Sequence, residues 1–325
     1  MSSEQLADGV NPLDAELAAT WDILKGYSGR DTDLGIGRRF GGATMAFSLR
    51  DIGAMNGPVI RVRRDTGGGA GDDDEEDFTA NQIDSGALED FVGSGNDGFV
   101  SIWYDQSGNG FHLESQSTDT QPFIVQSGTL TNGVHSPTSS SNATKKYLEV
   151  GPSPDFDSTD ITSSKFGWLA VMANMEENIN GGAGVIFGNT RGIVSYGAGS
   201  IALNLSDTNE GRMFVTNTYT TSAADFIGAV DDTDLFDSET IGTAVVDGSS
   251  LNTFLNGNTA SGTFSNLTLT STGNFRIFQS NNGLGGLRYQ TAAQGFIKEL
   301  MFMQGDTIDD IATIRNEVNN HYNIF

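Results

Sequence analysis

The sequence contains no cysteine and only three histidines. Without cysteine the chain has no disulfide, no thiolate metal ligand and no cysteine nucleophile. The histidines, His112, His135 and His321, are far apart in the sequence. Zinc sites draw mainly on cysteine and histidine, so this composition argues against one. We therefore expect neither a metal nor a cofactor.

Positive charge is also scarce, with 17 Lys and Arg residues against 42 Asp and Glu residues. The formal net charge is −25, and the isoelectric point is about 4.1. Nucleic acids and anionic membranes attract basic proteins and repel a chain of this charge. We therefore expect no nucleic-acid partner and no membrane partner.

Long apolar runs are missing as well, since no stretch reaches the roughly 18 residues of a membrane-spanning helix. The first residues, MSSEQLADGVNPLDAEL, carry acids and no apolar centre, which is not the pattern of a secretory signal. We expect synthesis in the cytoplasm of the producing cell. A virion component is made there too and leaves by lysis.

Glycine is abundant instead, with 42 residues against 6 prolines. Many short strands joined by glycine turns are expected from this composition, together with one helical excursion over 84–92. A C-terminal helix is expected to begin at Thr307 as its N-cap, with one apolar stripe. The pattern predicts an all-β, jelly-roll sandwich. The clearest predicted strands span 166–173, 184–188, 212–216, 242–247, 252–255 and 275–279, and further strands are predicted over 45–49, 59–63, 99–104 and 296–303.

Residues 1–40 differ in texture from the rest. Leu17, Trp21 and Leu24 are spaced for one face of a short helix. We expect two parts, an N-terminal attachment segment over 1–40 and a jelly-roll domain over 41–325. An aromatic side chain flanked by aliphatic ones is a frequent interface centre, so these three residues are candidates for docking on a larger particle. Packing on their own chain is the alternative.

The stretch FVSIWYDQSGNG, residues 99–110, is an aromatic strand followed by a polar turn with spaced glycines. Asp and Asn side chains bond nearby backbone N–H groups, so a tight corner explains every residue in it. Sugar binding is the second interpretation, with Tyr104, Asp105, Gln106 and Asn109 as candidate contacts. Trp103 belongs to the apolar strand and is expected in the core.

The segment GGGAGDDDEED, residues 67–77, places glycines before a run of acids. A solvated loop is the expected structure. Clustered carboxylates are also the ligands that calcium prefers, although the spacing is not that of an EF-hand loop.

Five motifs occur in order: AFSLRDI (46–52), GPVIRVRRD (57–65), FVGSG (91–95), GFVSIWYDQSGNG (98–110) and QPFIV (121–125). This order resembles the concanavalin-A-like (lectin/laminin-G) jelly-roll domain of phage virion proteins, which is similar to the catalytic domain of arabinofuranosidase B. The resemblance implies a structural virion protein on the head or tail surface. Its implied partners are other virion proteins and a host glycan, and its implied assembly is a homotrimer.

A carbohydrate-binding adhesin for host recognition is the first alternative, and an arabinofuranosidase-like hydrolase is the second. A retaining hydrolase needs two carboxyls about 5–5.5 Å apart. Glu176 and Glu177 are the candidates, with Asp247 or Asp105 as partner. The family's catalytic segments have no counterpart that we can identify in this sequence. We therefore expect no catalytic residues and no enzyme activity.

Overall fold

The structure is a computed structural model of the whole chain. It describes residues 42–53, 56–69, 71–115, 117–137, 146–151, 156–157, 160–176, 185–188, 201–205, 211–215, 230–231, 239–263, 273–279 and 294–325. The expected attachment segment, with Leu17, Trp21 and Leu24, lies outside these residues.

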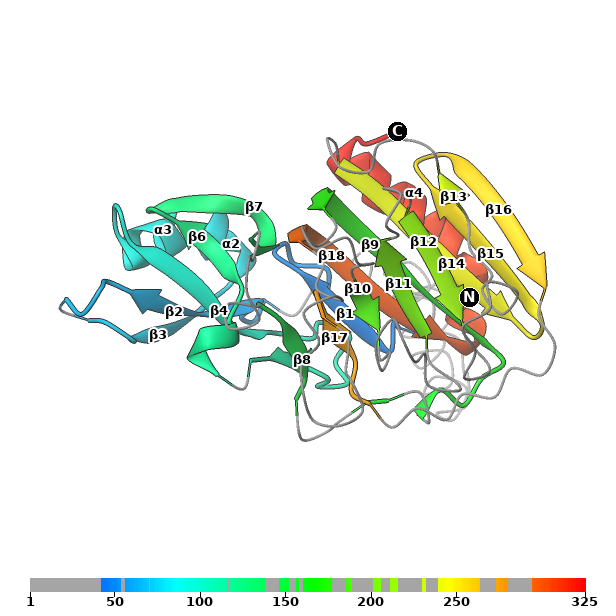
Figure 1. The fold of residues 1–325 in the computed structure, drawn as a ribbon, viewed down its shortest axis with the longest axis horizontal. Helices are drawn as coiled ribbons and strands as arrows, with labels where there is room; N and C mark the ends of the chain where they lie inside the picture. Colours follow the sequence, from blue (N-terminus) through cyan, green and yellow to red (C-terminus); the bar gives the residue numbers. More distant parts are fainter. Residues whose placement is uncertain are drawn as a thin grey trace, which may run out of the picture.

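Strands dominate the described chain, and helices are few (Figure 1). The first nine strands are β1 (Met45–Ser48), β2 (Ile60–Asp65), β3 (Glu75–Phe78), β4 (Asp97–Trp103), β5 (Leu113–Glu114), β6 (Phe123–Gln126), β7 (Thr129–Ser136), β8 (Leu148–Val150) and β9 (Lys165–Glu176). The others are β10 (Val185–Gly188), β11 (Ile201–Leu205), β12 (Gly211–Val215), β13 (Val230–Asp231), β14 (Glu239–Asp247), β15 (Ser250–Leu255), β16 (Asn258–Thr263), β17 (Arg276–Ile277) and β18 (Gln294–Gln304). The helical elements are α2 (Ala80–Asp84), α3 (Ala87–Val92), the short 3-10 turns η2 (Thr118–Thr120) and η7 (Gly305–Asp310), and α4 (Ile311–Tyr322).

The central layer is an antiparallel sheet in the order β16–β15–β14–β9–β18–β1. Strand β9 lies between β14 and β18, so Trp168 faces Ala244 on one side and Phe302 on the other. The apolar run in β9 is explained by this central position, because a strand covered on both faces carries few polar side chains.

A second group of strands continues the antiparallel pairing. Strands β3, β2, β4, β6 and β7 follow one another, and β7 joins β18. Strands β5, β8, β17, β10, β11 and β12 continue from β4. In Figure 1 the strands β2, β3, β4 and β6 form a lobe with α2 and α3 at one end of the molecule.

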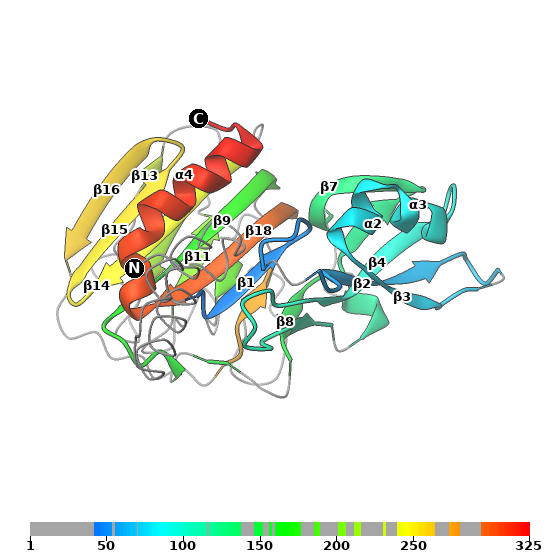
Figure 2. The same cartoon turned by 180° about the vertical axis from the view of Figure 1, so that it is seen from behind.

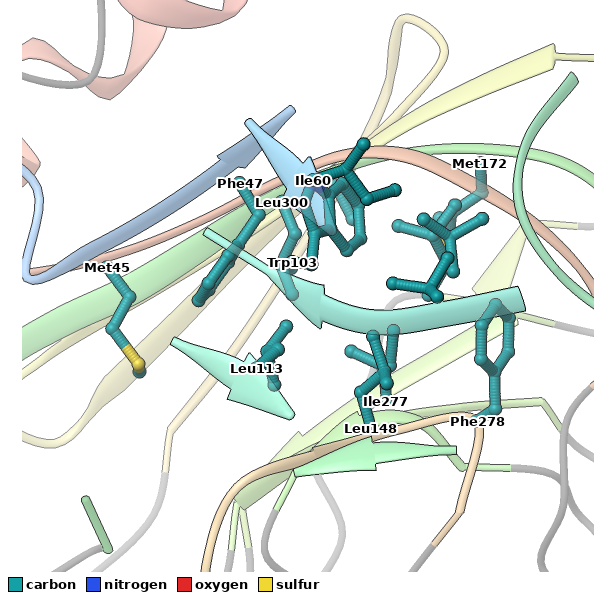
Figure 3. Packing of buried hydrophobic residues seen from close by; sticks show 14 of the residues in the cluster. Met45, Phe47, Ile60, Trp103, Leu113, Leu148, Met172, Ile277, Phe278 and Leu300 are labelled. Carbon is teal, nitrogen blue, oxygen red and sulfur yellow. The ribbon is translucent and has the colours of Figure 1, made fainter. Parts of the chain in front are cut away.

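The main core fills the space between these groups of strands. Trp103 on β4 and Trp168 on β9 are fully buried, which confirms their expected place in the core. Figure 3 shows Phe47 and Leu300 beside Trp103, with Ile277 pointing into the same interior. The large rings of the core bury the area that stabilises a sandwich without disulfides.

A smaller apolar layer lies on the other face of the central sheet, under α4 (Figure 2). Ile314 and Val318 of the helix pack there with Leu169 of β9. The helix begins later than the sequence predicts, because the 3-10 turn η7 comes first. Thr307 lies within that turn and donates its hydroxyl to the carbonyl of Gly42 at 3.1 Å, so it is no N-cap.

The expected helix over 84–92 is two short helices in the structure. Gly86 separates them in a left-handed conformation with φ 83°, which glycine adopts without strain. The first helix begins earlier than predicted, at a capping box in which the Thr79 and Gln82 side chains bond each other's backbone N–H groups. The all-β sandwich with a C-terminal helix is confirmed.

Candidate functional site

The turn after β4 is held together by Asp105. Its carboxylate is buried and accepts hydrogen bonds from the backbone N–H groups of Ala46 (2.9 Å), Ser107 (2.9 Å) and Phe111 (3.1 Å). The Ser107 hydroxyl donates a fourth at 2.7 Å. Asp105 therefore fixes both the shape of the turn and its position against β1.

Gln106 attaches the same turn to the segment after β1. Its side-chain oxygen accepts from the N–H groups of Ile52 (2.8 Å) and Gly53 (3.2 Å), and its amide nitrogen donates to the carbonyl of Ser48 at 2.8 Å. A Cβ at Gly53 would lie 2.5 Å from the backbone carbonyl oxygen of Gln106. The two backbone segments can therefore come this close only with glycine at position 53. Buried amides with full hydrogen bonding rigidify the surrounding backbone.

Tyr104, the last residue before this turn, is partly buried. Its hydroxyl donates to Asp77 at 2.8 Å, and its ring meets His112 edge-on with centroids 5.1 Å apart. Arg61 binds the same Asp77 carboxylate through two nitrogens at 2.7 and 2.9 Å, which lowers the pKa of Asp77. Burial and this carboxylate raise the pKa of Tyr104 well above its usual value.

An open cleft of about 440 Å³ lies beside the turn. Asn109 at the tip of the turn lines it, as do Phe111 just after the turn, Asp160 before β9 and Gln304 at the end of β18. The remaining lining residues are Gly42, Ala43, Thr44, Phe156 and Thr307. The cleft therefore joins four segments that are distant in sequence.

Three polar side chains of this cleft, those of Asn109, Asp160 and Gln304, each bond to the protein through only one of their two polar atoms. The amide nitrogen of Asn109 donates to the carbonyls of Ala43 (3.1 Å) and Thr44 (3.0 Å). One oxygen of Asp160 accepts from the Asp157 N–H at 2.8 Å, and the Gln304 oxygen accepts from the Thr162 N–H at 3.1 Å. The Asn109 oxygen, the second Asp160 oxygen and the Gln304 nitrogen have no bond to the described residues. These free atoms are held in place and suit the hydroxyl groups of a ligand.

The four predicted contact residues therefore have different places. Asn109 lines the cleft, and Asp105 supports it by fixing Phe111. Gln106 is buried, and Tyr104 does not line the cleft. No sequence motif pointed to Asp160 and Gln304, because they come from other segments. Phe111 is close enough to the turn motif to have been found.

Glu176 and Asp247, one of the carboxylate pairs suggested for hydrolysis, do not converge. Glu176 ends β9, while Asp247 faces Lys165 at the start of the same strand. Strand β9 has 12 residues, so a rise of about 3.3 Å per residue puts these two backbone positions roughly 36 Å apart. Asp247 lies 3.8 Å from the amine of Lys165. Glu177 lies outside the described residues.

The acidic segment 67–77 is not a loop throughout, because its last three residues, 75–77, belong to strand β3. Only the part before them connects β2 to β3, and acids in this part bind nearby groups. Asp73 pairs with Arg63 at 2.7 Å, and Asp74 pairs with Arg64 at 2.5 Å. The described residues contain no cluster of three His, Cys, Asp or Glu side chains placed to hold a metal ion. No helix among them is long and apolar enough to cross a membrane.

Comparisons with known proteins identify the fold. No family model matches the sequence, and no curated protein matches it. An arabinofuranosidase complexed with arabinofuranosyl-α-1,2-xylobiose superposes with a TM-score of 0.57 at 16% identity, covering 84% of this chain and 62% of the other. A GH54 α-l-arabinofuranosidase soaked with a cyclic sulfate inhibitor gives 0.55 at 16% identity, covering 85% and 62%. A GH54 mutant soaked with 4-nitrophenyl α-l-arabinofuranoside gives 0.58 at 15% identity, with the same coverage of 85% and 62%.

The chain thus spans 62% of the length of these solved proteins. The likeness establishes a jelly-roll-like β-sandwich shared with glycoside hydrolases. It contradicts our expectation that the chain is no enzyme, because the structures that share its fold are hydrolases. That expectation rested on catalytic segments without an identifiable counterpart, and matching segments are not needed to form the sandwich.

Proposed function

We propose that this chain recognises arabinofuranose-containing glycans in the cleft beside the 104–110 turn, as an outward-facing component of a phage particle. The cleft supports the glycan part of this proposal. It offers Phe111 as an apolar ring surface, and fixed donor and acceptor atoms on Asn109, Asp160 and Gln304. Sugars are bound by that combination, with a ring against the apolar sugar face and polar groups on the hydroxyls.

The fold supports the choice of sugar. The three structures compared above are arabinofuranosidases, one complexed and one soaked with an arabinofuranosyl compound. The direct experiment measures binding of linear arabino-oligosaccharides to the full chain by calorimetry. We expect Asn109→Ala and Asp160→Asn each to weaken binding about tenfold, the effect of losing one well-placed hydrogen bond to a ligand.

Asn320→Ala is the matched control, because Asn320 is exposed on α4 and is not a lining residue of the cleft. Equal affinity of wild type and both cleft variants would refute this location for the glycan site.

Hydrolysis of an arabinofuranoside in the same cleft is the second candidate function, favoured by the fold shared with three arabinofuranosidase structures. Asp160 supplies one carboxyl, and a retaining reaction needs a second about 5–5.5 Å away. Release of 4-nitrophenol from 4-nitrophenyl α-l-arabinofuranoside measures it. We expect Asp160→Asn to abolish turnover, and unchanged turnover in this variant would exclude Asp160 from the reaction.

The particle location is supported by the order of the five motifs between residues 46 and 125. In this proposal residues 1–40 attach to other virion proteins, and the acidic sandwich, as a homotrimer, faces outward. A net charge of −25 keeps such copies solvated and apart from neighbouring particles. Mass spectrometry of purified particles and light scattering of the isolated protein test location and assembly. Absence of the chain from the particles would overturn the location.

A further inference from the structure

A second cavity, of about 340 Å³, lies on the α4 side of the central sheet. In Figure 2 the helix crosses this face, and β15 and β16 extend beyond it to the sheet edge. Ile311 and Arg315 line the cavity from the helix. The strands contribute Thr243, Val245, Asn252, Thr253, Phe254, Thr259, Ala260 and Ser261.

Strand register places two rows of side chains on the cavity floor. One row runs Thr243, Phe254, Thr259, and the next runs Val245, Asn252, Ser261. Residues directly opposite one another in an antiparallel pair share a face of the sheet. Since Val245 packs in the apolar layer under α4, both rows face the helix side.

Arg315 is the cation of this cavity. Its guanidinium carbon lies 3.6 Å from the centroid of the Phe254 ring, which is contact distance for a stacked pair. Its Nε is buried, and among the described residues it has no hydrogen-bond acceptor and Arg315 has no ion-pair partner. Burial lowers the pKa of this guanidinium. A buried donor without an acceptor costs free energy, and no acceptor in the described part of the chain offsets the charge of Arg315.

Asn252, Thr259 and Ser261 are exposed beside this cation. Their side chains make no hydrogen bond within the part of the chain that the structure describes. They offer one amide and two hydroxyls on neighbouring strands, which is polar lining typical of a small-ligand site. The cavity thus combines one unpaired guanidinium with neutral groups suited to hydroxyls.

We propose that this cavity binds an acidic sugar residue of the uronate class, with its carboxylate on Arg315 and its hydroxyls on Asn252, Thr259 and Ser261. The guanidinium matches a carboxylate in charge and planar geometry. The flanking hydroxyls and amide favour a sugar over a simple organic acid. This site lies across the sheet from the main core and is separate from the cleft beside the 104–110 turn.

The net charge of −25 opposes an anionic ligand, but the opposition acts at long range. At 0.15 M salt the Debye length is about 8 Å, so distant acids are largely screened while a direct contact with Arg315 is not. Binding measurements therefore belong at that ionic strength.

In the experiment the full chain is titrated separately with trigalacturonate, neutral galactotriose and sodium succinate, and calorimetry measures the affinity for each. We expect trigalacturonate to bind, and both other probes to bind at least about tenfold more weakly. Arg315→Gln should lose about tenfold or more in affinity for trigalacturonate. Arg64→Gln, which removes the same charge from strand β2, should leave the affinity unchanged.

Ser261→Glu is a second variant. Because Ser261 is exposed, this variant should fold even if Arg315→Gln does not, and it can then test the site by itself. Its new carboxylate should occupy Arg315 and block trigalacturonate. Asn109→Ala in the other cleft should leave this binding intact, which separates the two sites. Equal binding of galactotriose or succinate, or unchanged affinity in both Arg315→Gln and Ser261→Glu, would overturn the proposal.

Discussion

Arg50 and Glu299 form a bidentate ion pair inside the protein, although 249 positions separate them in the chain. The Nε and Nη2 atoms of Arg50 lie 2.7 and 2.9 Å from the two carboxylate oxygens. The hydroxyls of Ser48 (3.0 Å) and Tyr322 (3.2 Å) donate to the same carboxylate. This one buried group therefore connects β1, β18 and α4, and together with burial it raises the pKa of Tyr322 well above its usual value.

Replacing Glu299 with glutamine should lower the free energy of unfolding by roughly 3 kcal/mol, because one member of a buried ion pair is left unpaired. Chemical denaturation measures this loss. Asp309→Asn is the matched control, since its pair with Lys165 is exposed to solvent and should contribute far less to stability. Equal effects of the two substitutions would show that burial of the pair is unimportant.

Asp105→Ala should lower the free energy of unfolding by at least about 1–2 kcal/mol, because three backbone N–H groups lose their acceptor. Thermal and denaturant unfolding measure it, with the exposed Asp119→Ala as control. An unchanged stability combined with lost glycan affinity would mean that Asp105 contacts ligand and does not build the turn.

Stability should fall between pH 6.5 and about 4 because of His135. Burial lowers its pKa from 6.5 to about 4, and its ring stacks on Phe296 with centroids 4.2 Å apart. In that window the unfolded chain binds a proton that the folded chain does not, so acid favours unfolding. The loss should reach roughly 1–2 kcal/mol after allowance for solvent screening.

His135→Phe keeps a ring against Phe296 and removes the proton, so its stability should depend less on pH in that window. At pH 7.5 His135 is neutral in both the folded and the unfolded chain. The difference in the free energy of unfolding between wild type and variant at that pH therefore reports only the packing effect of the substitution. Parallel pH profiles for wild type and variant would disprove the assignment.

A fragment of residues 41–325 should fold, stay soluble and melt cooperatively, because the described core is built from residues from Ala43 onward. It should fail to join particles if residues 1–40 carry the attachment. Calorimetry and particle incorporation measure the two parts. Incorporation at normal levels would place the attachment elsewhere, and failure to fold would remove the proposed boundary.

The sequence by itself determined the sandwich, the C-terminal helix and the buried place of Trp103 and Trp168. These features depend on local patterns, such as alternating apolar residues, glycine turns and an apolar helical stripe. It also pointed to the turn at 104–110, because aspartate, asparagine and glycine bond and bend backbone locally.

Only the tertiary structure decided what surrounds that turn. Asp160, Gln304 and Asn109 meet in one cleft because the segment before β9, the end of β18 and the turn after β4 lie beside one another. Arg315 reaches Phe254 because α4 lies across β14 and β15. The same holds for Arg50 and Glu299, since strand pairing brings β1 onto β18. Such meetings depend on which strands pair and where a helix docks, and packing over long sequence separations sets both.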